Sequence, residues 1–138
     1  PEALAALKQA TVLADGKADR HFWLGILYAQ SDSIPQARAS LTRSLEIDST
    51  GTFAGVAYRQ LGFYDLLDKN YDAATKKLER ATQLNDKDVQ AWVWLGQGYQ
   101  NMGNRSRALE SYKRALAIDP KQPDALKGVQ SLGGSAAK

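Results

Sequence analysis

The stretch of sequence that decides the fold reads WVWLGQGYQNMGNRSRALESYKRALAIDP and runs from residue 92 to residue 120. Its Leu-Gly pair at 95–96 occurs again at 61–62 and at 24–25, at spacings of 34 and 37 residues. Ala108 has counterparts at the same spacings in Ala74 and Ala37. Three copies in one register predict a repeat protein, in which each unit buries its apolar face against its neighbours.

The repeat register divides the chain into units of about 34 residues. Ser, Thr and Gly cluster between residues 49 and 54, and we place the three additional residues of the longer spacing there. The chain begins without a Met, so we expect it to be a fragment of a longer polypeptide. The expected repeat domain covers 1–132, with a half repeat at 1–17, full repeats at 18–51, 55–88 and 89–122, a capping helix at 123–132, and a flexible tail at 133–138.

Within each repeat the apolar residues have helical spacing. His21, Leu24 and Tyr28 lie on one face of a helix, for example, and no segment alternates as a strand does. Good N-cap residues, Ser33, Asn70 and Asn104, separate the two helical halves of the repeats. Just before them stand Gly103, Asp32 and Lys69, where we expect left-handed helix termini. The predicted helices cover roughly 1–14, 18–31, 34–48, 55–69, 71–85, 89–102, 105–118 and 123–132.

The spacing Trp92-x-x-Leu95-Gly96-x-x-Tyr99, followed by Ala108 and Pro120, resembles the tetratricopeptide repeat pattern. The resemblance covers about residues 1–132, although His21 and Tyr58 stand where the third repeat has Trp92. It implies an all-α fold, a right-handed superhelical solenoid of antiparallel helix pairs. It also implies that the first helices line a concave surface, and that the protein is a non-catalytic scaffold that binds a protein or peptide partner.

Glycine and a large apolar residue occupy paired places in every repeat. Gly25, Gly62 and Gly96 allow the two helices of a repeat to approach closely, and Leu41, Leu78 and Tyr112 fill the space beside them. His21 is expected to be a partly buried structural residue. Asp65 breaks the pattern, because it stands where the other repeats have Tyr28 and Tyr99. Either the helix is locally rotated so that Tyr64 replaces the missing aromatic ring, or Asp65 is exposed.

The composition excludes most catalytic and metal chemistry. The 138 residues include no Cys and one His, which rules out thiolate and multi-histidine metal sites. We therefore expect no enzyme activity, no cofactor and no metal. No apolar run reaches the length of a membrane span, and a net charge of +3 is too small to indicate nucleic-acid binding. Basic residues on the second helices, Lys77 and Arg107 among them, are expected to lie on a solvated convex face. The compartment is not predicted.

The resemblance implies a peptide-binding groove along the concave surface. The positions at which related proteins bind a terminal carboxylate hold Phe22, Ile26, Gln90 and Trp94 here, so the carboxylate clamp is missing. An apolar and aromatic groove favours an amphipathic helix or an extended apolar peptide. Arg59 and Gln60 are expected to fix the direction of the bound peptide or helix. The predicted groove residues are Phe22, Trp23, Ile26, Val56, Arg59, Gln60, Phe63, Gln90, Val93, Trp94 and Gln97.

Other interpretations stay open at this point. The groove aromatics could pack only between neighbouring first helices. The chain could be a homo-oligomeric assembly module, or a helper domain of a larger enzyme or secretion complex. Nucleic-acid binding through the basic second helices is a further alternative. Residues 1–14 lack a preceding helix, so we expect weak self-association through this N-terminal edge, where Leu4 and Leu7 lack cover on one side.

Overall fold

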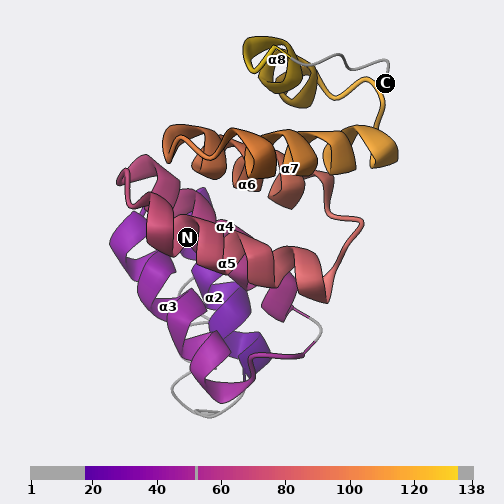
Figure 1. Ribbon diagram of the computed structural model, residues 1–138. Coiled ribbons are helices and arrows are strands. Elements are labelled where there is room, and N and C mark those ends of the chain that lie inside the picture. Colours follow the sequence, from indigo (N-terminus) through magenta and orange to yellow (C-terminus); the bar gives the residue numbers. More distant parts are fainter. Residues whose placement is uncertain (1–17, 52, 134–138) are drawn as a thin grey trace. The chain divides into compact units, whose positions relative to one another are not determined.

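The computed structural model describes residues 18–51 and 53–133, and these residues form seven α-helices and no strand (Figure 1). Each helix end lies within two residues of the position expected from the sequence, and the all-α fold class is confirmed. The expected helix over 1–14, with its N-terminal edge, and residues 134–138 lie outside the described residues. The helices are α2 (Ala18–Gln30), α3 (Ile34–Ile47), α4 (Ala54–Leu67), α5 (Tyr71–Leu84), α6 (Val89–Asn101), α7 (Arg105–Ile118) and α8 (Pro123–Ser131).

The chain forms two compact units, the first ending at Ala57 and the second beginning at Tyr58, so that the boundary falls within α4. In the first unit α2 and α3 form an antiparallel pair. A Cβ atom on Gly25 would lie 2.7 Å from Leu41 Cγ, so this glycine is what allows the two helices to approach. The Ser44 hydroxyl donates a hydrogen bond to the Ala18 carbonyl at 2.8 Å and joins the ends of the same pair.

The turns inside the helix pairs have the expected backbone geometry. Gly103 has φ of 78°, and Asp32 and Lys69 have φ of 60° and 62° at the equivalent places. Asn104 caps α7 by accepting a hydrogen bond from the Arg107 amide at 3.2 Å. Ser33 and Asn70 also occupy the expected N-cap positions of α3 and α5, but their side chains accept no capping hydrogen bond.

Tyr112 lies at the centre of the second unit. A Cβ atom on Gly96 would lie 2.7 Å from Tyr112 Cε1, and Gly128 of α8 approaches the other edge of the same ring. Gly62 stands 2.7 Å, measured in the same way, from Leu78 Cγ, so α4 and α5 repeat the arrangement. The expected pairing of each glycine with a large apolar residue is therefore confirmed in all three described repeats.

Replacing Gly96 by Leu should destabilise the second unit. The new side chain would meet the Tyr112 ring, which is 1% exposed and has no space to move into. We expect the free energy of unfolding to fall by about 1–3 kcal/mol, as is typical of overpacked cores. Urea titration followed by circular dichroism measures this loss. The matched variant Gln130→Leu, at an exposed site of α8, should unfold at nearly the wild-type midpoint.

Asp65 is buried, 4% exposed, so the expectation of an exposed Asp65 is wrong, and the neighbouring Tyr64 is buried as well, 3% exposed. Asp65 Oδ2 accepts a charged hydrogen bond from Lys77 Nζ at 2.5 Å. The sequence predicts that Lys77 lies on a solvated convex face, but in the structure its ammonium group pairs with a buried carboxylate. The equivalent places in the other repeats hold Tyr28 with Ser40, and Tyr99 with Ser111. The middle repeat thus has an ion pair where the other two repeats have a tyrosine and a serine.

This exchange predicts a coupled pair of substitutions. Lys77→Ser alone removes the lysine partner of a buried carboxylate and should cost about 2 kcal/mol, less than for a fully buried pair because Lys77 is 34% exposed. Asp65→Tyr together with Lys77→Ser installs the pair of the other repeats, and the double variant should be at least as stable as wild type. Thermal melts of the four proteins measure the coupling. Simple addition of the two single effects would contradict it.

Burial raises the pKa of the Tyr112 phenol from 10.0 to about 12, and the nearby Asp124 carboxylate adds to the shift. The hydroxyl donates a hydrogen bond to Gln100 Oε1 at 2.7 Å. The folded state therefore favours the neutral phenol. Its contribution to stability is complete below the pKa of the unfolded chain and is lost as the pH rises from about 10 to about 12.

Tyr112→Phe should remove this alkaline dependence. The two pKa values imply that wild type loses about 2–3 kcal/mol from this group above about pH 12. The phenylalanine variant has no phenol to ionise, so the difference in unfolding free energy between the two proteins should shrink as the pH rises. Denaturant titrations between about pH 8 and 12 measure that difference. Parallel curves for the two proteins would show that this phenol does not set the alkaline limit.

Candidate peptide-binding surface

Phe63 of α4 and Trp94 of α6 form a stacked aromatic pair in the second unit. Their ring centroids are 4.4 Å apart and the ring planes differ by 24°. Both side chains are half-buried, and Trp94 also packs against the hydrophobic core. The pair therefore packs between neighbouring first helices and at the same time leaves aromatic area exposed, so the two interpretations of these residues describe one arrangement.

Arg59 is held by the protein itself. Its Nη1 donates to Asp88 Oδ2 at 2.9 Å, and the side chains of Arg59 and Asp88 are 27% and 8% exposed. Asp88 uses its other oxygen to cap α6, accepting from the Ala91 amide at 3.2 Å. The guanidinium therefore fixes the N-terminus of α6 beside α4. Arg59 was expected to orient a bound peptide through a carboxylate or through backbone carbonyls; in the structure its Nη1 is already paired with a carboxylate of the protein itself.

The position shared by Phe22, Arg59 and Val93 faces the interior instead of an open groove. Val93 is 0% exposed and Phe22 is 3% exposed. Phe22 stacks on Phe53 with centroids 4.7 Å apart, while Val93 belongs to the core of the second unit. The assignment of Phe22 and Val93 as groove-lining residues is therefore wrong, because this helical position points toward neighbouring side chains within its own unit.

Three glutamines accompany the aromatic pair. Gln60 on α4, and Gln90 and Gln97 on α6, are half-buried. Within the described part of the chain, none of their side-chain amides has a hydrogen-bond partner. We call the set Gln60, Phe63, Gln90, Trp94 and Gln97 the amide–aromatic surface. It offers π faces with both donors and acceptors, and it has no charged member.

The C-terminal end of this region includes residues that the sequence reasoning missed. Asp124, Lys127 and Ser131 of α8 line a cavity of about 210 Å³ together with Gln97 and Gln100. Adding 34 residues to Gln90 and Gln97 would have identified Asp124 and Ser131, because α8 continues the series of first helices. The cavity therefore adds two charged side chains, Asp124 and Lys127, beside Gln97 of the amide–aromatic surface.

The first unit has its own aromatic cluster. Trp23 is 47% exposed and meets Phe22 and Phe53 edge-on, with centroid distances of 5.1 and 5.2 Å. Ile26 and Val56 are partly buried. Phe53 precedes α4 and was not predicted, since it lies in the connection where the repeat register shifts. His21 is buried, in agreement with its expected structural role.

The described residues contain no group of three His, Cys, Asp or Glu side chains that could hold a metal ion. Over the same residues no helix combines the length and apolar character of a membrane span.

The tetratricopeptide repeat model matches residues 89–122. Cellulose synthase operon protein C of Escherichia coli K12 is 31% identical over 86% of this chain, and the match spans 12% of that protein's length. The structure of MamA is 26% identical, with a TM-score of 0.84 over 94% of this chain and 74% of MamA.

A further solved structure has the same fold. YrrB, described as a tetratricopeptide repeat protein with an unusual peptide-binding site, superposes with a TM-score of 0.83 and 23% identity over 95% of this chain and 66% of YrrB. Its fold, like that of MamA, is an all-α helical repeat solenoid. The family model, the repeated glycine contacts and these neighbours agree, and this chain belongs to the tetratricopeptide repeat family.

Proposed function

We propose that the second unit binds an uncharged, apolar segment of a partner protein on the amide–aromatic surface. Tetratricopeptide repeat domains are generally non-catalytic modules for protein–protein interaction, which gives the class of function. The observation that supports the proposed site is the half-exposed Phe63–Trp94 stack, with centroids 4.4 Å apart. An exposed aromatic pair of this kind suits an apolar anchor residue.

The glutamines supply the polar part of the recognition. An amide side chain can donate to and accept from a peptide group at once, and so can bind an extended backbone without regard to its side chains. Gln60 precedes Phe63 by three residues on α4, and Gln90 precedes Trp94 by four residues on α6. Each amide is therefore about one helical turn from one ring of the aromatic pair. The protein would therefore recognise the ligand through hydrogen bonds to the ligand backbone and through one or two apolar side chains of the ligand.

The electrostatics favour a neutral ligand. Arg59, which could have attracted an acidic peptide, already pairs with Asp88 at 2.9 Å. Opposite charges within hydrogen-bonding distance largely cancel at longer range. Binding should consequently depend only weakly on salt, whereas nucleic-acid binding through the basic second helices would weaken steeply as salt rises.

The test begins with a displayed random-peptide library selected on the immobilised protein. The selected peptides should be rich in apolar and poor in charged residues. Trp94→Ala and Phe63→Ala should each reduce their affinity by about tenfold or more, as measured by fluorescence anisotropy. Both variants should also lose some stability, on the order of 1 kcal/mol, because they remove a stacked pair.

Two further variants separate binding from folding. Gln97→Ala removes a half-buried amide that has no hydrogen-bond partner among the described residues, and it should weaken binding several-fold without moving the melting temperature. Lys76→Ala, on the exposed face of α5, should change neither quantity. If Lys76→Ala weakens binding while Trp94→Ala does not, the ligand lies on the second helices and the proposed surface is wrong.

A further inference from the structure

A cavity of about 410 Å³ lies between α5 and α7 in the second unit, with α6 as its floor. Both α5 and α7 pack on α6 but not closely on each other, and this leaves the space open. The buried side chains of Leu95 and Tyr99 form the floor together with the half-buried Trp92. The walls are polar, and they consist of Glu79, Thr82 and Gln83 of α5 and of Arg107, Glu110 and Ser111 of α7.

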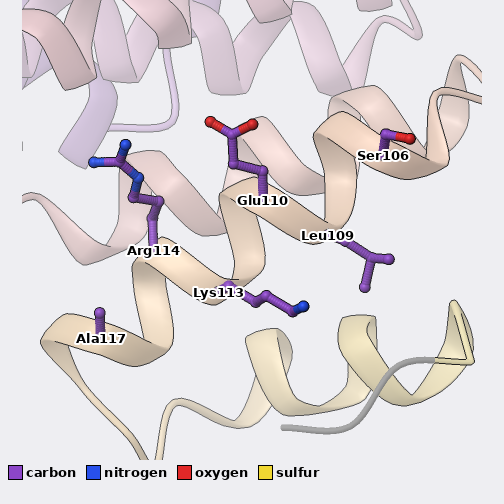
Figure 2. Close-up of a pocket in the computed structure, with 6 residues that line it drawn as sticks. All are labelled: Ser106, Leu109, Glu110, Lys113, Arg114 and Ala117. Atoms are coloured by element: carbon purple, nitrogen blue, oxygen red, sulfur yellow. The ribbon is translucent and has the colours of Figure 1, made fainter. Parts of the chain in front are cut away.

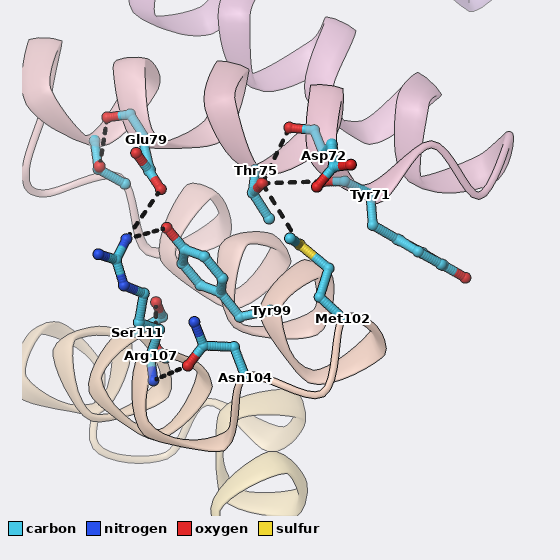
Figure 3. Close-up of polar contacts among 10 residues, drawn as sticks. Tyr71, Asp72, Thr75, Glu79, Tyr99, Met102, Asn104, Arg107 and Ser111 are labelled. Atoms are coloured by element: carbon cyan, nitrogen blue, oxygen red, sulfur yellow. Dashed lines mark hydrogen bonds and ion pairs between the residues drawn. The ribbon is translucent and has the colours of Figure 1, made fainter.

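The arginines around this cavity are held by groups of the protein itself. Arg107 Nη1 donates to the Tyr99 hydroxyl at 3.3 Å and lies 3.8 Å from Glu79 Oε1 (Figure 3). The Arg107 guanidinium also lies over the Tyr99 ring, 5.7 Å from the ring centroid. The Arg114 guanidinium lies over the Trp92 ring at 5.4 Å. One face of each aromatic ring is therefore already covered by a cation of the protein.

The carboxylates of the lining have acceptor capacity left. Glu110 is exposed, and Figure 2 shows it on the side of α7 away from α8. Among the described residues no side chain pairs with Glu110, and the one ion pair of Glu79 is longer than a hydrogen bond. The hydroxyls of Thr82 and Ser111 donate to backbone carbonyls of their own helices, so toward the cavity they can only accept. The lining is therefore richer in free acceptors than in free donors.

A cationic side chain with an apolar stem complements this lining, in which two carboxylates and one guanidinium give a net charge of −1. An arginine would compete with the guanidinium groups already on the two rings, whereas the compact ammonium of lysine needs no ring and donates up to three hydrogen bonds. We propose that the cavity between α5 and α7 binds a lysine side chain of a partner protein. The ammonium lies between the Glu79 and Glu110 carboxylates, and the aliphatic stem lies against Leu95.

The charges of this cavity are particular to one repeat. Lys76 and Ala73 stand 34 residues before Glu110 and Arg107 in the sequence. Both charged positions of the α7 wall thus differ from the preceding repeat and do not belong to the packing pattern that the repeats share. The site is separate from the amide–aromatic surface, and neither proposal depends on the other.

The test uses three synthetic peptides, Ac-Gly-Ala-X-Ala-Gly-NH2, in which X is lysine, norleucine or glutamate. Norleucine keeps the straight apolar stem of lysine and removes the charge. Each peptide is titrated into the isotope-labelled 138-residue protein, and NMR follows the indole N–H signals of its three tryptophans. The lysine peptide should shift the signal of Trp92, which lines the cavity, and leave that of Trp94 in place. It should bind at least about threefold more tightly than the norleucine peptide, and raising NaCl to about 0.5 M should shrink this advantage.

Removal of one carboxylate supplies the decisive comparison. Glu110→Gln keeps the shape of the side chain and removes its charge, so most of the advantage of lysine over norleucine should disappear. Asp72→Asn makes the same change of net charge at an exposed residue of α5 that does not line the cavity, and it should keep the advantage as in wild type. Melting curves confirm that each variant is folded.

Four results would each overturn the proposal. One is a Trp92 signal that stays in place at about 10 mM lysine peptide. A shift of the Trp94 signal instead would place the peptide on the amide–aromatic surface. An undiminished advantage of lysine in Glu110→Gln would leave the carboxylate without a role. Tightest binding by the glutamate peptide would show that the arginines around the cavity bind anions.

Discussion

Each described repeat depends on the close approach of two helices at a glycine. The second helix sends one large side chain, Leu41, Leu78 or Tyr112, against the backbone of the first helix at a place where a Cβ atom would lie only 2.7 Å away. Such contacts leave no room for a side chain on the first helix. They therefore fix how each helix is rotated about its axis, and this rotation decides which residues are buried and which remain on the surface.

The candidate peptide-binding surface follows from that rotation. The position of Phe22, Arg59 and Val93 turns inward, while the positions of Gln60 and Trp94, and of Phe63 and Gln97, stay half-exposed. Pairing with Asp88 compensates the desolvation of the Arg59 guanidinium, and pairing with Lys77 compensates that of the Asp65 carboxylate. Arg59 and Asp65 both stand where the other repeats have uncharged side chains, so the middle repeat keeps the backbone contact and changes the chemistry around it.

The repeats are alike in backbone and different in surface charge. Glu79 and Lys113 stand at the same place on successive second helices and carry opposite charges; Glu79 lies beside Arg107, and Lys113 is exposed. A repeat architecture thus presents similar shapes with separate specificities, because the packing residues keep the geometry while the outward residues are free to vary.

The sequence by itself determined the helices, their turns and the glycine contacts, because these features are local or repeat at the 34-residue spacing. Only the tertiary structure decided the partners of individual polar groups. The pairing of Arg59 with Asp88 joins residues 29 positions apart, and the burial of Asp65 depends on a lysine from the next helix. The burial of Val93 likewise depends on the side chains packed around it in the core of the second unit. A helical period gives the direction of a side chain but not what it meets, because that is set by the packing of neighbouring helices.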